Sequence, residues 1–113
     1  EGGGCVATVG STARSGGDES EEDEPEEDLP GALLYPCGLA FNRRGELFVS
    51  DTELSQILVY DASGAFVRRF GEQGDGEGEF DRPDGLAFTP SGDLVVADHG
   101  NNRVQVLRED GTF

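Results

Sequence analysis

Side chains able to do acid–base, metal or nucleophilic chemistry are few in this sequence. His99 is its one histidine, and Cys5 and Cys37 are far from it along the chain. A catalytic zinc ion needs about three protein ligands, which these residues do not assemble, so His99 could bind a metal only with residues from outside the chain. No Gly-x-Ser-x-Gly elbow indicates a nucleophile. We expect free thiols, no cofactor, no metal and no catalytic residue.

Two acidic stretches are the remaining candidates for ligand chemistry. GDGEGEFD at 74–81 has acids at alternating positions, as a calcium loop does. The bidentate Glu that completes such a loop is missing, so a flexible linker is the favoured interpretation. Residues 11–35 are rich in acid, Gly, Ser and Pro, and we expect a disordered, solvated insertion there. An acidic docking loop or a calcium-binding one is the alternative.

The charge balance excludes several classes of partner. The formal net charge is -16, and residues 36–113 alone carry 14 acids against 7 arginines. Nucleic-acid affinity depends mainly on neutralising phosphates, so the charge argues against DNA or RNA as the main partner. The same reasoning disfavours a membrane surface. No apolar run reaches transmembrane length, and the location stays unassigned, with the cytoplasm as the default.

A repeat supplies the framework that must position these residues. Residues 36–66 and 83–113 align without a gap at an offset of 47, with 12 of 31 positions identical. The identical residues are apolar, Gly, Pro or Asp, which is typical of a repeated supersecondary unit. Residues 5–10 align with 66–71 and predict the end of a preceding unit.

Short apolar runs separated by turns predict an all-β chain with no helix in 36–113. The runs are nearly continuous, which indicates strands covered on both faces, whereas FVRRF at 66–70 indicates a charged edge strand. Four-stranded meanders of this kind stack into a β-propeller. We expect strands at 38–42, 46–50, 56–61 and 65–70, then at 85–89, 93–97 and 103–107.

Turn chemistry accounts for most of the remaining repeated residues. In DHGNNR at 98–103, Asp and Asn side chains can bond their own backbone, and Arg103 could pair with Asp98. A structural role is therefore favoured over a partner-facing one. We assign turn roles to Gly38, Gly45, Asp51, Gly64, Gly85, Gly92, Asp98, Gly100 and Gly111.

The pattern PDGLAF, GDLVVAD and GNNRVQV in residues 83–107 resembles the NHL repeat. The resemblance is closest over 70–113 and weaker over 34–70, where ELSQ at 53–56 replaces GNNR. It implies a propeller, typically six-bladed, with an outer strand of a preceding blade at 1–10, an insertion at 11–35, and blades at 36–82 and 83–113, the second truncated.

The resemblance also implies function. Family members act as interaction platforms, including the target-selecting propellers of tripartite-motif ubiquitin ligases. We therefore expect a non-catalytic module for protein–protein interaction. The alternatives are a propeller enzyme of the amidating-lyase or lactonase kind, with metal ligands in other blades, and an RNA-binding propeller, which the charge opposes.

The meander topology places the insertion, the linker 71–84 and the loop 98–102 at one end of the sheets. That end should be acidic and should favour a basic protein partner. We expect the chain to be a slice of a longer protein, with assembly of three copies into a ring as the alternative. The candidate partner-binding residues are Arg82, His99, Asn101, Asn102 and Arg103.

Overall fold

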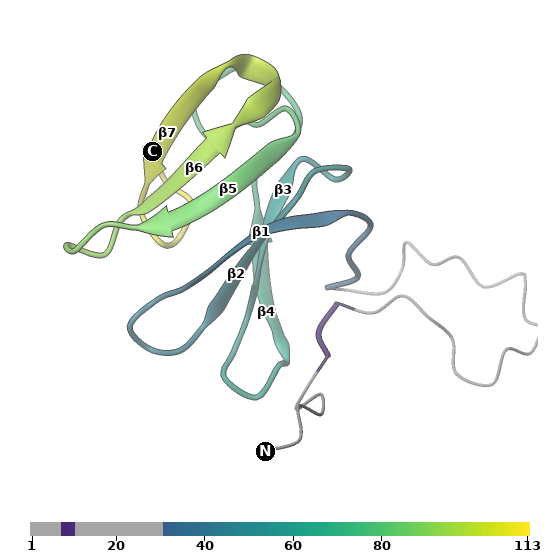
Figure 1. Cartoon of the computed structure of the whole chain (residues 1–113), viewed down its shortest axis with the longest axis vertical. Helices are drawn as coiled ribbons and strands as arrows, with labels where there is room; N and C mark the ends of the chain where they lie inside the picture. Colours follow the sequence, from purple (N-terminus) through teal and green to yellow (C-terminus); the bar gives the residue numbers. More distant parts are fainter. Residues whose placement is uncertain (1–7, 11–30) are drawn as a thin grey trace, which may run out of the picture.

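The computed structural model describes residues 8–10 and 31–113, which form two antiparallel sheets (Figure 1). The first sheet has the order β1 (Pro36–Phe41), β2 (Leu47–Asp51), β3 (Gln56–Tyr60) and β4 (Phe66–Phe70). The second has the order β5 (Pro83–Phe88), β6 (Leu94–Asp98) and β7 (Arg103–Leu107). All seven expected strands are present, so the all-β meander expected from the sequence is confirmed.

The two sheets repeat each other in register as well as in order. Leu39 pairs with Val49 in the first sheet, and Leu86 pairs with Val96 in the second. An irregularity follows the first residue of β1 and recurs at the same place in β5. The β1–β2 turn and the equivalent β5–β6 turn also contain a glycine of positive φ, Gly45 and Gly92, where a residue with a side chain would be strained.

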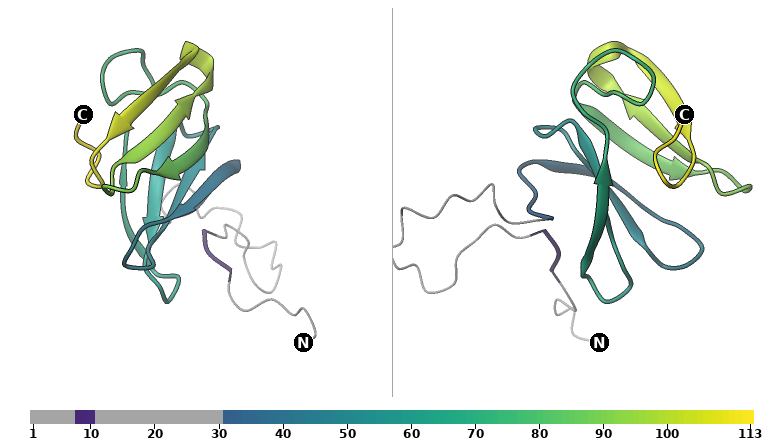
Figure 2. Two further views of the ribbon diagram at one scale, coloured as in Figure 1. Left: turned by 60° about the vertical axis from the view of Figure 1, so that its left-hand side comes forward. Right: turned by 180° about the vertical axis from the view of Figure 1, so that it is seen from behind.

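The main core lies between the sheets, which form separate layers with β5 against β1 and β2 (Figure 2). One face of the first sheet contributes Phe48, Ile57 and Val59, all fully buried. The second sheet meets them with residues that include Leu94, Val96 and Leu107. The β2 and β3 strands are buried on both faces, as their continuous apolar runs predict.

A second core lies on the other face of the first sheet. Val49, Leu58 and Tyr60 are buried there beneath Val9 and Leu33. The Tyr60 hydroxyl donates a 2.6 Å hydrogen bond to the carbonyl of Gly31, which ties the chain before β1 to this face. Residues 8–10 form no strand, and residues 5–7 lie outside the described residues, so the outer strand expected at 5–10 stays a prediction.

Two local features differ from the expectations. A single turn of 3₁₀ helix, η3 (His99–Asn101), which the sequence did not predict, follows β6 and ends at Asn102, whose backbone is left-handed with φ 55°. The edge strand β4 exposes Arg69, but Arg68 is half-buried, with its guanidinium 5.5 Å from the centre of the Phe48 ring. In the described part of the chain, no helix is long and apolar enough to span a membrane.

Candidate partner-binding face

The connections between β2 and β3, between β4 and β5, and between β6 and β7 emerge at one end of the two sheets. We call this the loop end and define it by residues 31–35, 51–55, 71–84 and 98–102. Main-chain contacts join these segments, because the Gly100 amide donates to the carbonyl of Asp81 and the Thr52 amide donates to the carbonyl of Tyr35. Residues 11–30 of the expected insertion lie outside the described residues.

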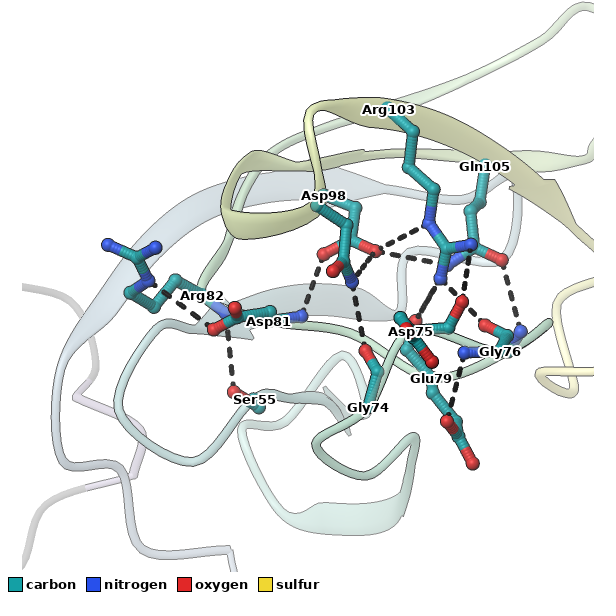
Figure 3. Close-up of polar contacts among 12 residues, drawn as sticks. Ser55, Gly74, Asp75, Gly76, Glu79, Asp81, Arg82, Asp98, Arg103 and Gln105 are labelled. Carbon is teal, nitrogen blue, oxygen red and sulfur yellow. Dashed lines mark hydrogen bonds and ion pairs between the residues drawn. The ribbon is translucent and has the colours of Figure 1, made fainter.

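A fully buried carboxylate, Asp98, organises the loop end of the second sheet (Figure 3). The main-chain amide of Asp81 donates to its Oδ1 at 2.7 Å. Its Oδ2 accepts hydrogen bonds of 2.9 Å from Asn101 Nδ2 and from Arg103 Nε. Gln105 Nε2 adds a longer contact of 3.4 Å, so both oxygens of the buried carboxylate are satisfied.

Arg103 connects this carboxylate to the linker 71–84. Its Nη1 donates to the carbonyl of Asp75, and its Nη2 donates to the carbonyls of Gly76 and Glu79, at 2.6–2.9 Å (Figure 3). Only arginine offers several donors in one plane, so a single side chain can hold the linker in a fixed path. The carbonyls of this glycine-rich segment bond to a guanidinium group, so the segment that the sequence predicts to be a flexible linker is held in place instead.

The equivalent carboxylate of the first sheet, Asp51, is also fully buried but has no arginine. Gln56 stands where Arg103 stands in the second repeat. Asp51 instead accepts main-chain hydrogen bonds from Leu34, Tyr35, Glu53 and Leu54 at 2.7–3.1 Å. The repeat thus keeps the buried acid while its donors change from side chains to main chain.

The environment of Asp98 sets its protonation. Burial by itself would raise the pKa of this carboxyl group. Hydrogen bonds from the Asp81 amide, from Asn101 and from Arg103, together with the positive charge of Arg103, outweigh burial and hold the pKa below its usual value. Asp98 is therefore an ionised structural anchor at neutral pH.

Solvent at the loop end meets mainly negative charge. The Arg82 side chain is 57% exposed, but its Nε lies 3.3 Å from an Asp81 carboxylate oxygen. The Arg103 side chain is 30% exposed and is directed at Asp98 and the linker carbonyls. The exposed acids at this end of the described chain are Glu53, Glu72, Asp75, Glu77 and Asp84.

The five candidate partner-binding residues divide into two groups. Arg82, His99 and Asn102 are exposed. Asn101 and Arg103 are partly buried, and their side chains already donate hydrogen bonds to the Gly74 carbonyl and to Asp98 respectively. A partner contact for these five residues stays a prediction.

Sequence reasoning missed two residues of this network. Gln105 is 3% exposed and donates at 2.8 Å to the carbonyl of Glu79, while its Oε1 accepts from the amide of Gly78. Its counterpart in the first repeat is the apolar Leu58, and a polar residue at a buried apolar position was the available signal. Ser55, 4% exposed, accepts from the Arg82 amide through its hydroxyl oxygen at 3.3 Å.

Neither a metal centre nor a reactive thiol emerges from the described residues. Within 8–10 and 31–113, no three His, Cys, Asp or Glu side chains lie close enough to hold a metal ion. Cys37 is a free, exposed thiol that donates to a carboxylate oxygen of Asp84 at 3.0 Å. The hydrogen bond to Asp84 is the main cause that raises the pKa of Cys37, which favours the unreactive protonated form.

Two successive antiparallel meanders, each with a buried acid at the loop end and packed face to face, define the chain as part of a β-propeller. Comparison with known families gives the particular repeat, because the NHL repeat model matches residues 80–107. The chain therefore contains an NHL repeat, as its resemblance in sequence predicts.

Curated relatives agree with this assignment. The chain is 44% identical over 54 residues to E3 ubiquitin-protein ligase TRIM71 of Rattus norvegicus, covering 48% of this chain and 6% of that protein. It is 30% identical over 87 residues to Protein brain tumor of Drosophila melanogaster, covering 75% of this chain and 8% of that protein. It is 40% identical over 72 residues to peptidylglycine alpha-amidating monooxygenase of Rattus norvegicus, covering 58% and 7%. The matched part spans less than a tenth of each of these relatives.

Proposed function

We propose that this NHL-repeat module is a non-catalytic protein-binding unit whose loop end docks a basic partner. The observation that carries the proposal is the set of five exposed acids at the loop end, where one arginine is exposed and paired with Asp81. Such a surface attracts cationic segments and speeds their association. Arg103 and Asp98 hold the linker 71–84, so the acidic surface is presented on a fixed backbone.

Similarity to TRIM71, an E3 ubiquitin-protein ligase, supports a place in a ubiquitin-ligase-like protein, with this module selecting the target. The enzyme alternative draws on the similarity to the amidating monooxygenase. It would need metal ligands outside the described residues, because the described residues contain no three-ligand cluster. An RNA-binding role is opposed by the exposed acids.

Binding of a short oligolysine and of a matched oligoglutamate, measured by fluorescence anisotropy at several salt concentrations, tests the proposal. We expect the oligolysine to bind, with affinity that falls as salt rises. The variant Glu72→Gln/Glu77→Gln should weaken binding and reduce its salt dependence. The control Ala62→Lys/Ser91→Lys changes the net charge equally at the opposite end of the sheets and should leave binding nearly unchanged. Equal binding of both peptides, or tighter binding of a single-stranded RNA, would refute the proposal.

A further inference from the structure

Three Asp–Gly pairs occur in the sequence, and their aspartates are Asp75, Asp84 and Asp110. The main-chain nitrogen of a glycine can attack the carboxyl carbon of a preceding aspartate, because glycine has no side chain to block the approach. The product is a five-membered succinimide ring. Water reopens the ring to aspartate or to isoaspartate, in which the main chain runs through the side-chain carbon. Reaction therefore depends on a free glycine amide and on a proton source at the carboxyl group.

The ladder between β5 and β6 is interrupted at one of these pairs. It joins Pro83 to Asp98 and resumes only at Leu86, so Asp84 and Gly85 are skipped. Both skipped residues are exposed to solvent. A Cβ built on Gly85 would have its nearest neighbour 3.9 Å away, so the space beside this residue is open. The Asp84–Gly85 pair therefore lies at an accessible irregularity of the strand.

The first repeat shows how a glycine amide at this irregularity can be satisfied. The ladder skips the equivalent residues there, and the Gly38 amide donates to the Ser50 hydroxyl oxygen at 2.8 Å. Ala97 stands at the position of Ser50 in the second repeat and offers no side-chain acceptor. The Gly85 amide therefore lacks the hydrogen bond that holds its counterpart.

The glycine amides of the other two pairs are both engaged. The Gly76 amide donates to Glu79 Oε1 at 3.0 Å, and the Gly111 amide donates to a main-chain carbonyl of its own turn at 2.9 Å. The amide and the hydroxyl of Thr112 also donate to the Asp110 carboxylate and hold its pKa below the usual value. Asp110 is therefore ionised and a poor target for attack.

The carboxyl group of Asp84 has a proton donor in contact with it. The Cys37 thiol donates to Asp84 Oδ1 at 3.0 Å. This hydrogen bond raises the pKa of Cys37, so the thiol is protonated at neutral pH. A thiol is a much stronger acid than the hydroxyl and amide groups that usually bind carboxylates, so it can give up its proton during a reaction.

We propose that Asp84–Gly85 is a site of self-modification, at which the chain forms a succinimide and then isoaspartate. The Gly85 nitrogen bonds to Asp84 Cγ and loses its hydrogen. One Asp84 carboxylate oxygen leaves as water, with that hydrogen and the thiol proton of Cys37, and solvent then reprotonates the thiolate. A second water molecule breaks the bond between the Asp84 carbonyl carbon and the Gly85 nitrogen, so the main chain runs through Cγ.

The modification changes the contact between the two repeats. The Asp84 main-chain carbonyl accepts a hydrogen bond from the Ser50 hydroxyl and lies against Gly38. In isoaspartate this carbonyl group becomes a free carboxylate, and the main chain gains one carbon atom beside it. The loop end therefore keeps its net charge, but its backbone lengthens where the two sheets meet.

Storage of the full chain in neutral buffer with a thiol reductant, followed by peptide mapping, tests the proposal. Electron-transfer fragmentation distinguishes isoaspartate from aspartate at each Asp–Gly pair. We expect isoaspartate to accumulate at Asp84 at least about tenfold faster than at Asp75 and Asp110, since a positioned proton donor alone typically accelerates a reaction by more than this. Asp75 and Asp110 are internal controls in the same sample.

Two variants separate the role of the thiol from that of the amide. Cys37→Ala removes the proton donor and should slow the reaction at Asp84 at least about tenfold at neutral pH. The difference should narrow at about pH 5, where the carboxyl group takes its proton from water. Ala97→Ser restores the acceptor of the first repeat and should also slow the reaction. Circular dichroism should show that both variants are folded.

The assignment of the modified residue has its own check. Gly85→Ala places a methyl group beside the attacking nitrogen and should remove most of the isoaspartate at Asp84. Isoaspartate that accumulates no faster at Asp84 than at Asp75 or Asp110 would overturn the proposal. A wild-type rate in either Cys37→Ala or Ala97→Ser would overturn it as well, because the reaction would then not depend on the contacts that distinguish this pair.

Discussion

Replacement of Arg103 by alanine is the most informative perturbation of the loop end. The change removes a 2.9 Å ion pair with the fully buried Asp98 and three hydrogen bonds to linker carbonyls. Loss of one partner of a buried ion pair destabilises a protein by about 3–5 kcal/mol. Arg103 is 30% exposed and Asp98 keeps its bonds from Asp81 and Asn101, so we expect about 2–4 kcal/mol for Arg103→Ala.

Urea denaturation followed by far-UV circular dichroism measures this loss, because the chain contains no tryptophan for fluorescence. With a denaturant dependence of about 1–3 kcal/mol/M, a loss of about 2–4 kcal/mol should lower the midpoint by at least about 0.7 M. Arg69→Ala is the matched control, since Arg69 is exposed on the edge strand, and it should change stability by less than about 0.5 kcal/mol.

A double-mutant cycle separates the ion pair from the linker contacts. Asp98→Asn removes the charge that Arg103 neutralises, so the double variant should be more stable than the sum of the single losses implies. If Arg103→Ala matched Arg69→Ala in stability, the assignment of Arg103 as the clamp of the linker would be refuted.

Three further outcomes follow from buried or closely packed groups. The pKa of Asp98 is lower in the folded state than in the unfolded state. The stability advantage of the wild type over Asp98→Asn should therefore be complete above about pH 4 and should disappear as the pH falls through the folded-state pKa. Acid denaturation curves of the two proteins measure this difference. Gly38→Ala should lower the thermal midpoint by several degrees, because the new methyl group would overlap the Asp84 carbonyl oxygen. Gly85→Ala is the matched control and should leave the midpoint unchanged, because the nearest atom to its new methyl group is 3.9 Å away. Both midpoints are measured in dilute solution. Burial, with a smaller effect of the Asp51 charge, raises the pKa of Tyr60 to about 12, so the chain should lose stability between about pH 10 and 12, and Tyr60→Phe should remove that loss in alkaline denaturation.

The strands and their order could be predicted because their signals are local. Glycines such as Gly45 and Gly92 mark turns, and the runs LFV and ILVY mark strands buried on both faces. The 47-residue repeat then adds a check, since each assignment in one copy must hold in the other. The pairing of Arg103 with Asp98 was also accessible, because both residues flank the same short turn.

Contacts between distant segments were not accessible in this way. The linker carbonyls that Arg103 binds carry no residue-specific signal, because a main-chain carbonyl is present at every position. Arg68 looks like a solvated edge charge in FVRRF, yet its Nη2 donates to the carbonyl of Glu109 and its guanidinium lies over Phe48. That position depends on the turn after β7, 41 residues further along the chain.

The main-chain hydrogen bond between Leu33 and Gly10 has a consequence for the acidic sequence between them. The Leu33 amide donates a 2.9 Å hydrogen bond to the Gly10 carbonyl, and both neighbouring stretches are anchored on the first sheet through Val9 and Tyr60. The described residues on either side of this segment therefore lie side by side on the first sheet. Because a closed loop costs little more entropy as it lengthens, we expect a change in the number of residues between Gly10 and Gly31 to cost the sheets little stability. This position is therefore a suitable insertion site, where a different peptide could be placed between Gly10 and Gly31 without changing the sheets.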